Sequence, residues 1–87
     1  MTATDTTETI RKEIAAMASR RPREVKLEDT LYSLGLDSLD ILEVVMSVEE
    51  RLGIEFSDQE VESLVLVSDV VNLATEKMVN ITTSSSS

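Results

Sequence analysis

One serine of the chain is placed where a side-chain hydroxyl could carry a covalent group. Ser38 follows Gly35 and lies between two carboxylates, Asp37 and Asp40. The run indicates a turn and then a helix start, where Ser and Asp are both favoured N-caps, so either Asp37 or Ser38 could cap it. A phosphate ester on Ser38 would lie near the positive end of the helix dipole, which favours the anion by about 0.3–1 kcal/mol. Ser38 is therefore a candidate attachment point, with plain capping as the alternative.

The chain lacks the groups that would activate this serine. It contains no His and no Cys, which excludes a Ser-His-Asp or Cys-His mechanism and a thiolate metal site. The carboxylates of Asp37, Asp40 and Glu43 would also repel an anionic nucleophile. We therefore predict no catalytic residue and no metal site, and we expect a partner protein to perform any chemistry at Ser38.

Two other uses of these residues are disfavoured by the sequence. A Gly-Asp-Ser-Leu hydrolase motif is interrupted by Leu36 and would need a His. Residues 37–49 are acidic, but they lack the alternating oxygen ligands and the internal Gly of an EF-hand calcium loop. The serine and its neighbouring acids are thus expected to serve a carrying or binding function, and the chain is not expected to be an enzyme.

Charge is distributed unevenly along the 87 residues, whose net charge is −9. Residues 1–26 carry a net +2, residues 28–62 a net −10, and residues 63–87 a net −1. Such acidity repels nucleic acid and anionic membranes and attracts basic protein surfaces, although the same acids could form only a solubilising face. The sequence shows neither an apolar run of roughly 18 residues nor a secretion signal. We expect a cytoplasmic protein without nucleic acid binding or membrane insertion.

The spacing of apolar residues predicts the elements that must position Ser38. Helices are expected over residues 5–19, 37–52, 57–63 and 68–79. The connection over residues 20–37 is long, but its spaced apolar residues indicate that it is pinned across the helices. The prediction is an all-α bundle of three main helices and one short helix, with a long first loop.

The second of these helices has the clearest pattern. Gly53 should end it, and Ser38, Leu42 and Met46 follow one another at one-turn spacing in a row beside its buried stripe. In the first helix, Arg11 is expected to point outward. The predicted buried stripe of the second helix consists of Ile41, Val44, Val45, Val48 and Leu52. The chain is expected to divide into a flexible N-terminus (1–4), one folded domain (5–79) and a disordered Ser/Thr tail (80–87).

Several stretches resemble one known family. Residues 34–40, with the letters LGLDSLD, are similar to the phosphopantetheine motif of the acyl carrier proteins. Residues 42–50 resemble the second helix of that family, residues 55–58 its link into the third helix, and residues 67–71 its last helix. The resemblance covers roughly residues 8–79. It implies a four-helix acyl-carrier-like bundle, so that the domain over residues 5–79 would be a carrier domain.

The resemblance implies a cofactor and a function. A phosphopantetheinyl transferase would attach 4'-phosphopantetheine from coenzyme A to Ser38, and the thiol of the arm would hold acyl groups as thioesters. This would explain how a chain without Cys carries out thiol chemistry. The protein would be a monomer that shuttles acyl groups between enzymes of fatty acid or polyketide and specialised lipid biosynthesis. The apolar pair Val65-Leu66 and the Arg-rich first loop favour a specialised pathway.

The resemblance also implies roles for other residues. Partner enzymes, namely acyl and ketoacyl synthases and transferases with basic docking surfaces, would bind an acidic and apolar surface on the second helix. That docking surface comprises Asp37, Leu39, Asp40, Leu42, Glu43, Met46, Glu49 and Glu50. An acyl pocket, whose residues could equally be plain core, comprises Val44, Val48, Phe56, Val61, Leu64 and Val70.

Two related functions remain as alternatives. A peptidyl carrier would hold an amino acid, but Asp37 and the high acid content disfavour it. An adaptor that keeps the fold but is never loaded is disfavoured by the intact Ser38. The sequence also departs from the family pattern, because Val67 and not a polar residue precedes the last helix. We expect the cap of that helix to come from Ser68 or to be absent.

Overall fold

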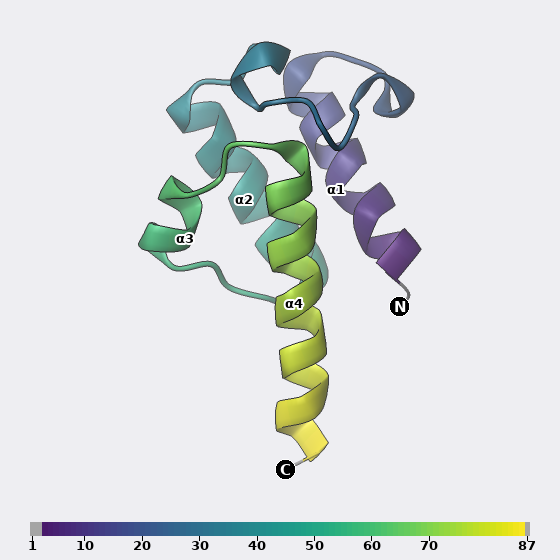
Figure 1. Ribbon diagram of the computed structural model, residues 1–87, viewed down its shortest axis with the longest axis vertical. Helices are drawn as coiled ribbons and strands as arrows, with labels where there is room; N and C mark the ends of the chain where they lie inside the picture. Colours follow the sequence, from purple (N-terminus) through teal and green to yellow (C-terminus); the bar gives the residue numbers. More distant parts are fainter. Residues whose placement is uncertain (1–2, 87) are drawn as a thin grey trace.

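The fold is an all-α bundle, as predicted. A computed structural model describes the backbone of residues 3–86 and the side chains of residues 5–79. Over these residues α1 (Ala3–Ala18), α2 (Ser38–Leu52) and α4 (Val67–Ser86) are the main helices, and α3 (Asp58–Glu62) is the short one (Figure 1). The long first connection contains two 3₁₀ turns, η1 (Pro22–Glu24) and η2 (Tyr32–Leu34). None of the described helices is both long and apolar enough to cross a membrane.

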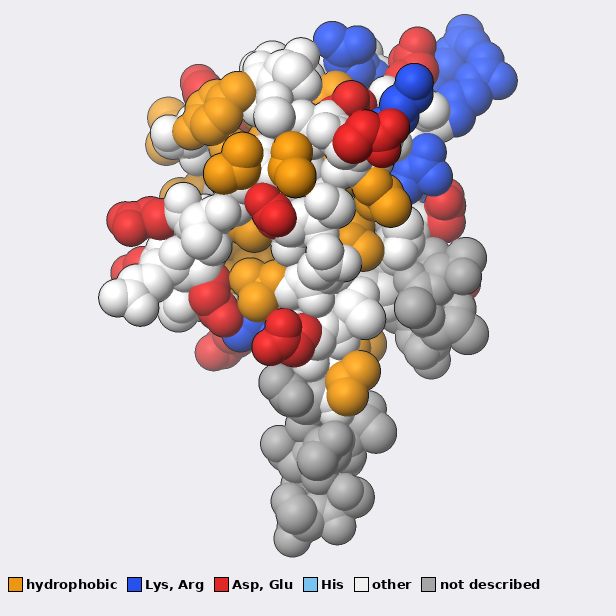
Figure 2. Space-filling view, in the orientation of Figure 1, with side chains coloured by type: hydrophobic (Ala, Val, Ile, Leu, Met, Phe, Trp, Pro, Cys, Tyr) orange, Lys and Arg blue, Asp and Glu red, His pale blue; other side chains and the backbone are white. Residues whose placement is uncertain are grey.

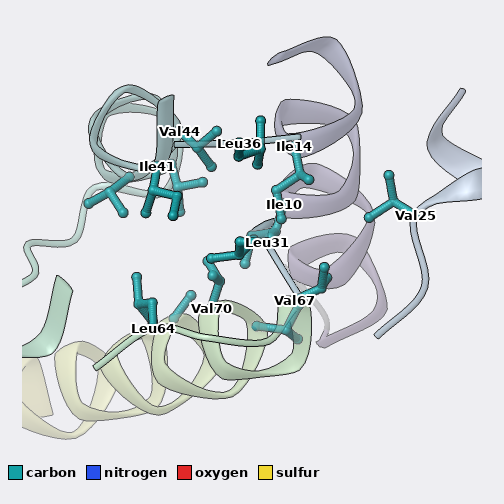
Figure 3. Close-up of a cluster of buried hydrophobic side chains, with 14 of the residues drawn as sticks. Ile10, Ile14, Val25, Leu31, Leu36, Ile41, Val44, Leu64, Val67 and Val70 are labelled. Carbon is teal, nitrogen blue, oxygen red and sulfur yellow. The ribbon is translucent and has the colours of Figure 1, made fainter. Parts of the chain in front are cut away.

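The core lies between α1, α2 and α4, with α1 packed against both of the others. Figure 3 shows Ile10 and Ile14 of α1 pointing toward the same space as Val44 of α2 and Val70 of α4. Every member of the predicted α2 stripe is buried, which confirms the period and register of that helix. Because aliphatic side chains make up this core, the position of α2 depends on interlocked packing against α1 and α4.

Helix ends agree with the sequence for α2 and differ for α1 and α4. Gly53 ends α2 with a φ of +68°, a left-handed conformation that favours glycine. Helix α1 begins at Ala3, two residues before the expected start, and α4 continues to Ser86, past the expected end at residue 79. Residues 80–86 contain neither Gly nor Pro, so no strong stop signal follows residue 79. The expected flexible start and disordered tail involve side chains outside those described, and the division of the chain stays a prediction.

The first connection is pinned along its length, as its spaced apolar residues predicted. Val25, Leu31, Leu34 and Leu36 are buried, whereas Leu27 is exposed. The expectation that Arg11 points outward was wrong, because its guanidinium donates from Nε to the Val25 carbonyl (3.0 Å) and from Nη2 to a carbonyl of η1, that of Pro22 (3.1 Å). These bonds anchor the first connection to α1, and the bond to Val25 gives a donor to a carbonyl outside the helices.

The far part of this connection is hydrogen-bonded to the segment between α3 and α4 and to the first residue of α4. The Leu31 N–H donates to the Val65 carbonyl (2.8 Å), and the Val67 N–H donates to the Asp29 carbonyl (2.9 Å). Asp69 caps the start of α4, since its Oδ2 accepts from the backbone N–H groups of Val65 (3.0 Å) and Leu66 (2.8 Å). The expectation that Ser68 or nothing would cap α4 was therefore wrong.

Replacing Arg11 tests whether the first connection depends on this side chain. Arg11→Met should lower the free energy of unfolding by about 1–2 kcal/mol, because it leaves two loop carbonyls without their charged donor. Lys12→Met is the matched control, because Lys12 is exposed on the same helix. Urea denaturation of both variants measures the difference. Equal stability of the two variants would contradict the assigned role of Arg11.

Candidate functional site

The start of α2 is capped by an aspartate pair. The Asp40 N–H donates to Asp37 Oδ1 (2.9 Å), and the Asp37 N–H donates to Asp40 Oδ2 (3.2 Å). Asp37 is therefore the N-cap, and Ser38 is the first residue inside the helix. The alternative that Ser38 serves as the cap does not hold, because Asp37 performs that function.

The Ser38 hydroxyl is available for attachment. Ser38 is exposed, and its side chain makes no hydrogen bond within the described part of the chain. Gly35, with a φ of +86°, turns the chain after η2, and Leu36 is buried just before the helix. A buried anchor, a turn and a separate cap thus present the hydroxyl at a surface corner. The geometry fits a phosphodiester there, since the first N–H groups of α2 point toward its N-terminal end.

A cavity of about 220 Å³ opens beside Ser38, between η2, α2 and the α3 region. Its lining includes Val61 and Leu64 from the predicted acyl pocket, together with Ile41 one turn from Ser38. Tyr32 and Glu62 complete the lining with Ser38, and the sequence analysis missed them. The other predicted pocket residues are buried in the core and do not line this cavity: Val44, Val48, Phe56 and Val70.

Three lining residues, Tyr32, Ile41 and Glu62, were not predicted to line a pocket, and they differ in whether the sequence could have indicated them. Ile41 follows Ser38 by three residues, so helical spacing alone places the two near each other. Tyr32 and Glu62 come from separate segments that only the tertiary fold brings to Ser38. Composition and spacing carry no signal for such a meeting.

The predicted docking surface lies on α2 and is largely accessible. Three large apolar side chains on it are exposed to water, Leu39 at 71%, Met46 at 57% and Leu42 at 44%. Asp37, Glu43 and Glu50 are also exposed. Isolated exposed apolar residues are ordinary, but three on one helix beside Ser38 form a patch that favours a protein contact.

Three acids of this surface have structural partners as well, and the first is Asp37, the cap of α2. Asp40 is half-buried in the α2 capping pair, and Glu49 Oε2 accepts from the Phe56 N–H (2.8 Å) in the link to α3. Changing any of the three would disturb the fold as well as any docking. Glu43 and Glu50, which have no such bond within the described residues, are the cleaner reporters of docking.

Comparison with known proteins agrees with this geometry. A family whose sequence model is described as "Phosphopantetheine attachment site" matches residues 8–76. The fold and the matched site define a carrier with a phosphopantetheine prosthetic group.

Individual relatives narrow this class. An acyl carrier protein of Campylobacter concisus is 44% identical over 66 residues, which are 75% of this chain and 86% of that protein. One of Campylobacter hominis is 42% identical over 65 residues, 74% of this chain and 82% of its own length. The crystal structure of an acyl carrier protein from Thermotoga maritima superposes with a TM-score of 0.66 at 26% identity, covering 83% of this chain and 94% of that one.

The chain belongs to the acyl carrier protein family. Its prosthetic group is a covalently attached phosphopantetheine, and proteins of this family are carriers and not catalysts. Membership also implies interaction with biosynthetic enzymes.

The capping function of Asp37 can be separated from its charge. Asp37→Ala should lower the free energy of unfolding by about 1 kcal/mol, because the Asp40 N–H loses its acceptor. Asp37→Ser should restore most of this loss, since a serine hydroxyl caps a helix about as well without a charge. Urea denaturation at moderate salt provides the measurement. A similar loss in both variants would show that charge, and not capping, accounts for the stability.

Proposed function

We propose that Ser38 carries the phosphopantetheine and that the protein shuttles acyl thioesters between enzymes of fatty acid or polyketide and specialised lipid biosynthesis. One observation carries the assignment to Ser38. Its hydroxyl is exposed and free of hydrogen bonds within the described residues, because Asp37 caps the helix in its place. The cavity beside Ser38 gives an attached acyl chain apolar side chains to contact.

The chain presents the acceptor, and a phosphopantetheinyl transferase supplies the activation. Ser38 Oγ would form a bond to the phosphorus of coenzyme A that bears the pantetheine. The pyrophosphate bond would break, adenosine 3',5'-bisphosphate would leave, and the hydroxyl proton would pass to a base of the transferase. When bound, the arm supplies a terminal thiol that holds acyl groups as thioesters. The α2 N-terminus then stabilises the attached phosphodiester through its dipole.

Intact-protein mass tests the attachment point. Incubation with a promiscuous phosphopantetheinyl transferase and coenzyme A should raise the mass of the chain by one phosphopantetheinyl group. Ser38→Ala should abolish the gain, because it removes the acceptor oxygen.

Ser33→Ala is the matched control for this experiment. Ser33 is exposed in the neighbouring turn η2, where its hydroxyl donates to the Thr30 carbonyl (2.7 Å). This variant should gain mass as the unchanged chain does. A gain that survives Ser38→Ala would place the attachment elsewhere, and no gain in the unchanged chain would contradict the carrier function.

Partner enzymes are proposed to bind the α2 surface around Ser38. Its exposed acids would attract basic surfaces on the phosphopantetheinyl transferase and on the acyl and ketoacyl synthases and transferases. The exposed side chains of Leu39, Leu42 and Met46 would add apolar contacts. The Debye length is about 8 Å at physiological salt, so these contacts are weak and short-lived. A carrier that must leave each enzyme requires such contacts.

Glu43→Lys should slow loading by a transferase roughly fivefold at low salt, because the reversed charge repels a basic partner. Glu76→Lys is the matched control, since Glu76 is exposed on α4 and the change in net charge is the same. Initial rates of coenzyme A consumption at low and high salt measure the effect. Equal rates for both variants at low salt would count against docking on α2.

The proposal also covers the cargo that the protein carries, the pathway it serves and the compartment in which it acts. The lining residues Val61, Leu64 and Ile41 would contact the acyl chain near Ser38. The exposed Val65 and the Arg-rich first connection favour a specialised pathway. The protein is proposed to act as a monomer in the cytoplasm, where carrier, transferase and acyl-using enzymes would share one compartment.

A further inference from the structure

Helix α3 forms one wall of the cavity beside Ser38 and has little core packing of its own. It is five residues long, and none of its described side chains is fully buried. Val61 is half-buried and Glu62 is exposed, and both line the cavity. At its start, Ser57 Oγ accepts from the Glu60 N–H (3.1 Å), while the Ser57 N–H donates to Glu60 Oε1 (2.8 Å). These bonds define the helix, but they do not attach it to the rest of the molecule.

One cation on α4 contacts α3 and the link that precedes it. Lys77 Nζ lies 2.8 Å from Glu60 Oε1 and 5.8 Å from the centroid of the Phe56 ring. The Lys77 side chain is only 23% exposed, so its stem is packed while its ammonium group reaches both partners. Figure 1 shows α3 set to one side of α4, joined to the neighbouring helices by extended links.

The lowered pKa of the Glu60 carboxyl is consistent with its contact with Lys77. The hydrogen bond from Lys77, followed by that from the Ser57 N–H, holds the pKa of the Glu60 carboxyl below its ordinary value. Glu60 is therefore ionised throughout the neutral range, and the pair persists there. Glu60 directly precedes Val61, so the ion pair acts on the residue next to the cavity lining.

We propose that Lys77 is a positioning residue that holds α3 closed over the cavity and thereby shields a thioester-bound acyl chain from water. The inference rests on the proposed function, because it assigns a purpose to the same cavity. A partly exposed ion pair and a cation–π contact are individually weak. Together they shift an equilibrium between closed and open α3 by about fivefold, which is enough to retain cargo and still permit release.

Cleavage of a loaded thioester by hydroxylamine tests the proposal. The full chain is loaded with octanoyl-phosphopantetheine or acetyl-phosphopantetheine, and free octanoyl-pantetheine serves as the unshielded reference. Lys77→Met should accelerate cleavage of the octanoyl thioester about fivefold, because the α3 wall opens more often. The acetyl thioester should be unaffected, since a two-carbon group has little chain to bury.

Control variants separate positioning from general stability. Arg51→Met removes another ion pair, in which Arg51 Nε lies 2.9 Å from Glu13 Oε2 between α2 and α1, away from the cavity lining. This variant should leave octanoyl cleavage unchanged, and Lys77→Arg should restore shielding. Glu60→Gln should accelerate cleavage less than Lys77→Met, because the contact of Lys77 with the Phe56 ring remains, and the double variant should match Lys77→Met. Circular dichroism confirms that each variant is folded, and Glu60→Gln replaces Lys77→Met if the latter is not.

The outcomes distinguish the inference from the function on which it rests. If the octanoyl thioester of the unchanged loaded protein is cleaved as fast as free octanoyl-pantetheine, the proposal that the cavity holds the acyl chain is wrong. If it is protected and Lys77→Met keeps that protection, only the role of Lys77 is overturned. Equal acceleration by Arg51→Met would likewise overturn it, because loss of any ion pair would then suffice.

Discussion

The paired hydrogen bonds between Asp37 and Asp40 determine where α2 begins, and the functional surface follows from that start. Once the helix begins at Ser38, its period of 3.6 residues places Leu42 and Met46 in a row below the serine. The same register turns Ile41, Val44 and the rest of the stripe into the core. A start shifted by one residue would lengthen or shorten the helix at that end, and Ser38 would no longer be its first residue, next to the unpaired N–H groups of the first turn.

Helix α2 and its site could be predicted from local signals. A glycine turn, a cap, an unbroken aliphatic stripe and a terminal Gly53 lie within a short stretch of sequence and agree with one another. The capping of α4 by Asp69 and the anchoring of the first connection by Arg11 could not be predicted. Each requires knowing which backbone groups remain unsatisfied after the helices have packed.

The complete lining of the cavity beside Ser38 could not be predicted either, because it also depends on how the helices pack. Tyr32 and Glu62 come from η2 and α3, and only packing brings them to Ser38 and Ile41 on α2. The predicted pocket instead named residues that alternate toward the core, such as Val48 and Val70, because burial is what hydrophobic spacing reports. Spacing cannot distinguish a side chain that fills the core from one that borders a void.

The acids and bases of this chain are unevenly distributed over the molecule, although Arg11, Arg51 and Lys77 each pair with an acid. Figure 2 shows most of the visible Lys and Arg side chains at one end of the face, with some acids among them, while other acids are spread over the rest of that face. Not all acids near Ser38 are available to partners, since Asp40 and Glu49 already accept backbone hydrogen bonds. Some carboxylates of α2 therefore stabilise the fold, and others remain available to bind partners. The net charge consequently overestimates the number of acids that can dock a partner.

The separation of cap and attachment point has a thermodynamic consequence. A group bound to Ser38 replaces no hydrogen bond of the helix start, because Asp37 retains its bond to the Asp40 N–H. Modification therefore removes no stabilising hydrogen bond from the helix start, and the dipole of α2 adds a favourable contact in the modified chain. A transferase can accordingly act on an already folded domain without working against its stability, and a population of carriers in different loading states shares a single scaffold.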